Sequence, residues 1–218
     1  MKDIVIYGAG GLGREVACII NQINQKAEEP LWNLLGFYDD GQPKGLTNDY
    51  GSILGALDDL VAYPKHISVI MGIATPMVVS KIVSQLKKNP NIDFPNIISP
   101  DLEFFDANNY SMGEGNFVNK RCMMSINTHL GNFNSLGAGT TIGHDAHIGD
   151  FNVFMPMVQI CGHALIGCLN FFGLSSIMLQ DLKVNEGITL GAASILMKDA
   201  TIDNATYFGN PARVIIKK

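Results

Sequence analysis

A six-residue repeat of apolar positions fills the second half of the chain. Cut every six residues from residue 113, the sequence up to residue 214 gives seventeen hexads without an insertion, and each ends in Val, Met, Leu, Ile or Phe. Hydrophobic residues make up only 47% of the chain, so an unbroken series at one phase is not a chance pattern. The period predicts short strands joined by tight turns, three of which close one coil of about eighteen residues. About five to six stacked coils would bury one aliphatic column. Nine hexads begin with glycine, which we expect to supply the turn dihedrals.

The first 88 residues follow a different pattern, in which apolar strands alternate with amphipathic helices. Strands are expected at residues 3–7, 34–40 and 68–74, and helices at residues 13–23 and 76–88. The second helix ends in lysines, as a helix C-terminus favours. This order predicts a small parallel sheet with helices on its faces.

A proline-rich segment separates the two patterns. Pro90, Pro95 and Pro100 fall within eleven residues, and proline prevents a helix from continuing. We therefore expect an α/β domain over residues 1–98 and a β-solenoid domain over residues 99–218.

Composition excludes several classes of protein. The formal net charge is −5 and the sequence has no basic block, which argues against a nucleic-acid partner. Apolar runs are too short for a transmembrane helix or a signal-peptide core, so we expect a cytoplasmic protein without membrane contact. The cysteines form no CxxC pair and are expected to be free thiols: Cys18, Cys122, Cys161 and Cys168.

Residues 8–13, GAGGLG, form a GxGxxG motif between the first strand and the first helix. Such glycines let a phosphate approach the backbone at a helix N-terminus. Asp39 and Asp40 close the next strand, where an acid typically meets a ribose or a base. The alternatives are a tight turn without a ligand and a solvated pair of acids. Because the domain has room for only half of a dinucleotide fold, a single nucleotide fits it better than NAD.

His144-Asp145 is the candidate for acid–base chemistry. Histidine suits proton removal near neutral pH, and an adjacent acid can hold its tautomer. The alternative is an exposed turn residue. Metal binding by a β-helix of this kind would need H-x4-H spacing, whereas the gaps after His129 are 15, 3 and 16, so no metal site is expected. His147 and His163 are interpreted as surface or interface residues, and Cys161 beside His163 is not taken as a catalytic pair.

Four motifs in this order resemble the NeuD/PglD-type sugar acetyltransferases: IYGAGGLGREVA, GFYDD, TIGHDAHIGDF and GNPARVI. The resemblance covers essentially the whole chain. It implies a Rossmann-like N-terminal domain, a left-handed parallel β-helix, acetyl-CoA as co-substrate, and a homotrimer with each active site in a cleft between neighbouring β-helices.

The resemblance also implies roles for particular residues. His144 corresponds to the general base and Asp145 to the acid that supports it. The positions that would bind acetyl-CoA are Gly162, Leu174, Gly191, Ala192 and Arg213. The positions that would line the nucleotide or sugar pocket are Gly10, Gly11, Asp39, Asp40 and Gly72. In two places the chain departs from the family, because Leu12 and Val153 stand where many members have histidines.

The resemblance thus implies acetyl transfer from acetyl-CoA to a sugar, with the amino group of a nucleotide-linked amino sugar as the expected acceptor. One alternative is O-acetylation of sialic acid or a related sugar. Another is a non-catalytic trimeric scaffold that binds sugar nucleotides, and a third is a nicotinamide oxidoreductase. The third is disfavoured by the half-sized nucleotide domain.

Overall fold

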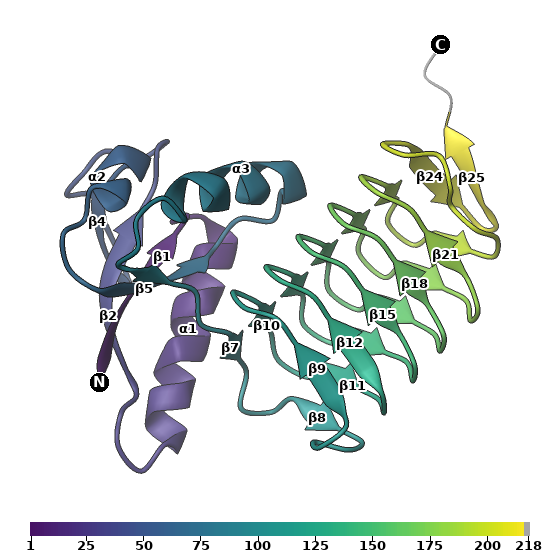
Figure 1. The fold of residues 1–218 in the computed structure, drawn as a ribbon, viewed down its shortest axis with the longest axis horizontal. Coiled ribbons are helices and arrows are strands. Elements are labelled where there is room, and N and C mark those ends of the chain that lie inside the picture. The colour runs from purple at the N-terminus through teal and green to yellow at the C-terminus, as the bar shows by residue number, and fades with distance from the viewer. Residues whose placement is uncertain (216–218) are drawn as a thin grey trace. The chain divides into compact units, whose positions relative to one another are not determined.

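The computed structural model describes residues 1–215, and these form two compact units (Figure 1). The first unit consists of Met1–Pro100 and Glu114–Phe117, and the second of Asp101–Gly113 and the chain from Val118 onward. The segment Glu114–Phe117 joins the first unit through hydrogen bonds. Lys87 Nζ donates to Glu114 Oε1 at 2.7 Å, and the Asn116 amide donates to Asn96 Oδ1 at 2.8 Å. This segment follows the boundary that the prolines predict, so the first unit is not one continuous stretch.

The first unit is built on a mixed six-stranded sheet with the order β3-β4-β2-β1-β5-β6. Its strands are β1 (Lys2–Tyr7), β2 (Trp32–Tyr38), β3 (Thr47–Asn48), β4 (Gly51–Gly55), β5 (Ile67–Met71) and β6 (Ile92–Asp93). Its helices are α1 (Gly11–Lys26), α2 (Leu57–Val61) and α3 (Pro76–Leu86), and β7 (Ile97–Ile98) follows. All sheet pairings are parallel except β3 with β4. The Rossmann-like arrangement predicted from the sequence is therefore confirmed.

Alternation along β1 explains how α1 docks on the sheet. Ile4 and Ile6 share one face of the strand and belong to one buried cluster with Val16 and Ile20 of α1. The strand order reverses at β1, which pairs with β2 on one side and β5 on the other. In open α/β sheets, ligands bind beside such a reversal, at the carboxyl ends of the strands. The GxGxxG loop follows β1 directly at that end.

The second unit is a left-handed parallel β-helix with three sheets, as the hexads and the resemblance predict (Figure 1). One sheet contains β8 (Glu103–Phe104), β11 (Met123–Met124), β14 (Thr141–Ile142), β17 (Gln159–Ile160), β20 (Ile177–Met178) and β23 (Ile195–Leu196). The second contains β9 (Tyr110–Met112), β12 (Thr128–Leu130), β15 (His147–Ile148), β18 (Leu165–Ile166) and β21 (Lys183–Val184). The third runs through β10 (Phe117–Val118), β13 (Ser135–Leu136), β16 (Val153–Phe154), β19 (Phe171–Phe172), β22 (Thr189–Leu190) and β24 (Thr206–Gly209), and ends in β25 (Ala212–Ile215). Thr141 pairs with Met123 and with Gln159, so one coil takes eighteen residues.

The turn glycines have a different role from the one expected. Along residues 1–215, twelve residues other than glycine have left-handed dihedrals, and eleven of them stand at the third position of a hexad, for example Asn127 with φ 53° and Asp145 with φ 57°. Glycine at the first position instead allows close approach of the next coil. A Cβ at Gly143 would lie 2.6 Å from the Gly162 backbone nitrogen. The prediction that glycine supplies the turn dihedrals is therefore wrong for most coils.

The apolar column is confirmed for fourteen hexads and ends before the last three. Residues at the sixth position from Val118 to Leu196 are all buried, whereas Ile202 and Phe208 are each 55% exposed. The final coil is shorter: Val184 forms a parallel β-bridge with Ala200, which is only sixteen residues later in the sequence. Ala200 takes the buried place, and the antiparallel hairpin of β24 and β25 follows as the last element described. The prediction of seventeen regular hexads was wrong at this end.

A ladder of buried asparagines joins successive coils along one corner. Asn134, Asn152 and Asn170 are each at most 1% exposed and eighteen residues apart. The Asn152 amide and side-chain nitrogens donate to Asn134 Oδ1 at 2.9 and 3.0 Å, and the Asn170 amide donates to Asn152 Oδ1 at 2.9 Å. The ladder satisfies backbone groups that a wholly apolar core would leave unpaired.

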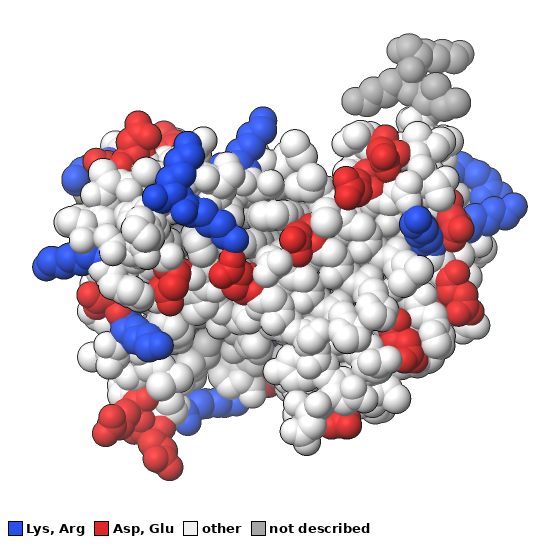
Figure 2. Space-filling model, in the orientation of Figure 1, with Lys and Arg blue, Asp and Glu red and all other residues white. Residues whose placement is uncertain are grey.

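On the face drawn in Figure 2, basic and acidic side chains of the described residues are interspersed, and no continuous basic patch extends across that face. Among residues 1–215, no helix combines the length and apolar character needed to cross a membrane.

Candidate active site

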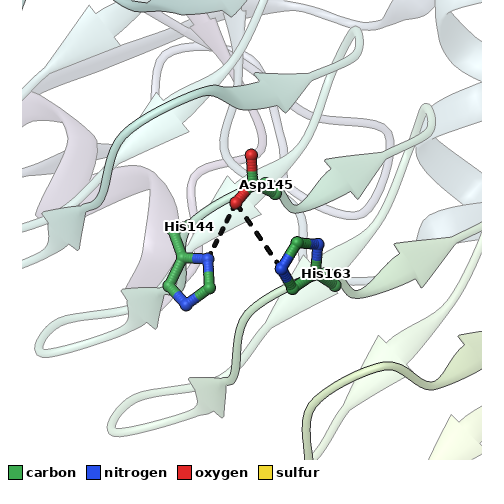
Figure 3. A group of neighbouring side chains, drawn as sticks. All are labelled: His144, Asp145 and His163. Atoms are coloured by element: carbon green, nitrogen blue, oxygen red, sulfur yellow. Dashed lines mark hydrogen bonds and ion pairs between the residues drawn. The ribbon is translucent and has the colours of Figure 1, made fainter.

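His144 and Asp145 lie at the corner between β14 and β15 (Figure 3). We call this the His144 corner and define it by Asn127, Asp145, His163 and Asp181, which occupy the same left-handed turn position in successive coils. His144 Nδ1 lies 2.8 Å from Asp145 Oδ2. When Nδ1 carries the proton and donates to this carboxylate, Nε2 keeps a lone pair. The His144 side chain is 53% exposed, so this lone pair is accessible to a substrate.

Asp145 is held as a carboxylate by its neighbours. Asn127 Nδ2 donates to Asp145 Oδ1 at 2.7 Å, and His144 occupies the other oxygen. The hydrogen bond from Asn127, and then the one from His144, lower the pKa of Asp145 below its ordinary value. Asp145 therefore stays charged in neutral and mildly acidic solution, where it orients the His144 imidazole and stabilises an imidazolium.

His163 also contacts this carboxylate, which the sequence interpretation missed. His163 Nε2 lies 3.7 Å from Asp145 Oδ2, and its ring meets the His144 ring edge-on with centroids 5.0 Å apart. His163 stands eighteen residues after Asp145, one full coil, so the repeat length contains the signal that would have placed it there.

Gly162 lies directly against the His144 ring. A Cβ at Gly162 would lie 2.6 Å from both Cε1 and Nε2 of His144. The glycine that was expected to line the acetyl-CoA groove therefore also sets the position of the imidazole.

For the acetyl transfer with His144 as base that the resemblance implies, replacing Gly162 with alanine is expected to lower kcat about tenfold or more with a small change in stability. The new methyl group would displace the exposed imidazole, and small misplacements of a catalytic group are costly in rate. Gly167→Ala is the matched control, since its Cβ would meet the Asn185 backbone oxygen at 2.9 Å and so reduce stability instead. Acetyl-transfer kinetics and thermal unfolding of both variants separate the two effects. A Gly162→Ala protein with unchanged kcat would contradict the role given to this glycine.

The other positions expected to bind acetyl-CoA lie at a different corner of the β-helix. Leu174 and Ala192 are neighbours in successive coils between β19 and β20 and between β22 and β23, where the Ala193 amide donates to the Leu174 oxygen at 2.8 Å. We call this the Leu174 corner. Gly191 is adjacent and packs under Phe208, while Arg213 lies opposite Phe208 in the terminal hairpin and is exposed. A single chain thus does not bring these residues to the His144 corner.

In the first unit, Asp39 fastens the loop that follows β1, and Asp40 links the end of β1 to the start of α2. Asp39 Oδ2 accepts the Ala9 amide at 2.8 Å, and Asp40 accepts the Tyr7 hydroxyl and the Leu57 amide, each at 2.8 Å. Burial, followed by the hydrogen bond to Asp40, raises the pKa of Tyr7. The structure therefore brings Asp39 to the GxGxxG loop and Asp40 to the last residue of β1 before it, and both carboxylates already accept hydrogen bonds from backbone or side-chain donors.

The glycines of this loop divide into two kinds. Gly8, Gly13 and Gly72 pack against one another, and a Cβ at Gly72 would lie 2.6 Å from the Gly13 Cα. Gly72 therefore serves the packing of α1 on the sheet. By contrast, a Cβ at Gly10 or Gly11 would meet no other heavy atom of the described chain within 4 Å.

The open side of the loop is suited to an anion. Gly10 precedes α1 without a side-chain cap, and a helix N-terminus favours negative charge. A small cavity of about 190 Å³ adjoins it, lined in part by Ala9, Arg14 and Asn48. Arg14, which follows the glycine motif directly, is a cation that the sequence interpretation missed. Leu12 packs instead against the buried cluster beneath α1.

Comparison with known proteins supports the fold. Residues 3–86 match the family described as PglD N-terminal domain. The acetyltransferase domain of PglB from Neisseria gonorrhoeae, solved with acetyl coenzyme A, is 21% identical with a TM-score of 0.85 over 98% of this chain and 99% of that one. WeeI from Acinetobacter baumannii is 24% identical with a TM-score of 0.83 over 99% and 100%. A mutant perosamine N-acetyltransferase from Caulobacter crescentus, solved with CoA and GDP-perosamine, is 16% identical with a TM-score of 0.85 over 100% and 98%. No curated protein sequence matches the chain.

Fold and candidate site together define a two-domain protein of the left-handed β-helix class. The resemblance to the NeuD/PglD-type family that the four motifs indicated is confirmed, since the N-terminal residues form a PglD-type domain and the whole chain shares the fold of these structures.

Proposed function

We propose that this protein transfers an acetyl group from acetyl-CoA to the amino group of a nucleotide-linked amino sugar, with His144 as the general base. The observation that carries the proposal is the hydrogen-bonded series Asn127–Asp145–His144 at an exposed corner of the β-helix. It supplies an oriented imidazole on a fold that is shared with structures solved with acetyl coenzyme A and with GDP-perosamine.

The reaction needs no covalent enzyme intermediate. The sugar amine attacks the thioester carbonyl, and His144 Nε2 takes the proton that the nitrogen loses. Asp145 stabilises the imidazolium through Nδ1. Collapse of the tetrahedral intermediate breaks the carbon–sulfur bond, and the departing thiolate receives the proton from His144. Backbone amides would stabilise the oxyanion.

We further propose a homotrimer in which the Leu174 corner of one copy faces the His144 corner of the next. In one chain the two groups of residues occupy different corners, so a second copy is needed to bring them together. Leu174 is 50% exposed, as expected of a side chain that a partner or cofactor covers. Light scattering should give three times the mass of the chain, and a monomer in active preparations would refute the arrangement.

The acceptor's nucleotide is assigned to the first unit. Gly10 and Gly11 would let its phosphates reach the α1 N-terminus, and Arg14 would add positive charge. Asp39 would shape the pocket mainly by holding the loop, and Asp40 by holding the end of β1 beside it. Since acetyl-CoA is the proposed donor, we place the reaction in the cytoplasm, and subcellular fractionation would test that location.

Val153 bears on the identity of the acceptor. It replaces a histidine of the enzymes that act on 4-amino sugars and lies buried on β16, in a different sheet from β14 and β15. A hydroxyl acceptor, as in O-acetylation of sialic acid, is therefore the second candidate.

A panel of acceptors tests the proposal. UDP-, dTDP- and GDP-linked 4-amino sugars and free sialic acid would each be incubated with acetyl-CoA, and the product identified by mass spectrometry. An added acetyl group that survives mild base is an amide, and one that is released is an ester. Acetylation of an amino sugar is expected. Acetylation of sialic acid alone would replace the first candidate by the second.

A further inference from the structure

A cluster of three side chains at the His144 corner offers the ligands of a metal site. His144, Asp145 and His163 each present one ligand atom, and these atoms lie within 4.8 Å of one another (Figure 3). Asp145 Oδ2 is the shared centre, 2.8 Å from His144 Nδ1 and 3.7 Å from His163 Nε2.

The two separations from Asp145 Oδ2 are close to those of a tetrahedral zinc site, while the two histidine nitrogens lie within 4.8 Å of each other. With metal–ligand bonds of about 2.0–2.2 Å, tetrahedral geometry puts ligand atoms about 3.2–3.5 Å apart. The two observed distances lie on either side of this range. His144 and His163 are both more than half exposed, so small side-chain rotations can adjust them.

The chemical nature of the three ligand atoms also determines which metal ions this cluster favours. Two imidazole nitrogens and one carboxylate suit Zn²⁺ and neighbouring transition metals, whereas Mg²⁺ and Ca²⁺ prefer oxygen ligands. Three protein ligands leave a fourth position for water. The corner is exposed, so an ion can enter from solvent.

We propose that His144, Asp145 and His163 bind Zn²⁺, and that the bound ion switches off His144 as a base. The inhibitory part rests on the proposed function. In the active form Nδ1 carries the proton and Nε2 the lone pair. Zn²⁺ takes the Nδ1 lone pair, so the ring proton moves to Nε2 through solvent and Nε2 can no longer accept a proton from the sugar amine. The ion is thus an inhibitor and not a cofactor of the transfer.

Metal binding is tested first, without reference to activity. The full chain is freed of metal by dialysis against a chelator and titrated with Zn²⁺ in competition with a chromogenic chelator. The wild type should bind one ion per chain, and His163→Asn should bind at least about 100-fold more weakly. Asparagine suits this position, because Asn127 holds the same left-handed turn two coils earlier.

His147→Gln is the matched control. His147 is exposed on β15 and stacks on His129 with ring centroids 4.3 Å apart, so this pair is the nearest rival for the ion. Its Zn²⁺ affinity should stay within about twofold of the wild type. Unchanged affinity in His163→Asn, or lost affinity in His147→Gln, would overturn the proposed site.

Thiol release from acetyl-CoA then tests the inhibition. Zn²⁺ should stop the wild-type reaction, a chelator should restore it, and any activity of His163→Asn should persist at the same Zn²⁺ concentration. Binding of Zn²⁺ by a wild type that never acetylates a sugar would remove the proposed function and leave the metal site. Acetylation by a wild type that does not bind Zn²⁺ would remove the metal site and leave the function.

Discussion

Replacing His144 with alanine is expected to lower kcat for acetyl transfer by roughly 10²–10⁴-fold, the usual contribution of a general base. The variant loses the lone pair that takes the proton of the attacking amine, while Asn127 still holds Asp145. Folding should change little, because the His144 side chain is half exposed and its hydrogen bond to Asp145 lies at the surface. Steady-state thiol release, together with thermal unfolding of the same preparations, measures both quantities.

Two further variants make this result specific. His147→Gln alters an exposed imidazole three residues away and should keep the wild-type rate. Asp145→Asn retains the shape and tolerates the left-handed turn at φ 57°, but lacks the charge that stabilises the imidazolium. It should lie between the wild type and His144→Ala. Full activity in His144→Ala would show that another group removes the proton.

Replacing Asn152 with alanine is expected to lower the free energy of unfolding by about 2–5 kcal/mol. Its side chain is completely buried, donates to Asn134 Oδ1 and accepts the Asn170 amide. Alanine leaves that amide without its acceptor, and each buried polar group left unsatisfied costs about 1–3 kcal/mol. The small cavity left by the amide group adds to the loss.

Urea denaturation at one fixed protein concentration measures this effect, since assembly makes stability depend on concentration. Asn108→Ala removes an exposed asparagine amide from the same unit and should change the free energy by less than about 0.5 kcal/mol. If Asn152→Ala were as stable as Asn108→Ala, the asparagine ladder would not be what stabilises this corner.

The central part of the β-helix could be predicted from apolar spacing alone, and its C-terminal end could not. Residues from Val118 to Leu196 obey one phase because each strand points its last side chain inward. Ile202 and Phe208 are also hydrophobic and also stand at the sixth position of their hexads, so in the sequence they look like core residues. The shortened final coil turns them outward, and nothing in their own hydrophobicity reveals this.

The candidate site was partly predictable for a related reason. Adjacency along the chain was enough to pair His144 with Asp145. His163 required the eighteen-residue coil, which puts it above Asp145. The same arithmetic separates Gly162 from Leu174, which are twelve residues apart and so fall on different corners, and groups Leu174 with Ala192, eighteen residues later.

The structural role of glycine could not be predicted from spacing. Gly162 and Gly143 look alike in the sequence, yet one adjoins the His144 imidazole and the other the backbone of the next coil. Such differences depend on which atoms pack against each glycine Cα, and only the folded structure shows these atoms.

Free-thiol release from acetyl-CoA in the presence of nucleotide-linked amino sugars is the most direct test of acetyl transfer by this protein. Thiol should appear only when both substrates are present, in equal amount to the acetylated sugar. Binding of a nucleotide sugar and of acetyl-CoA without any thiol release would contradict it, and would identify the protein as a non-catalytic scaffold on this fold.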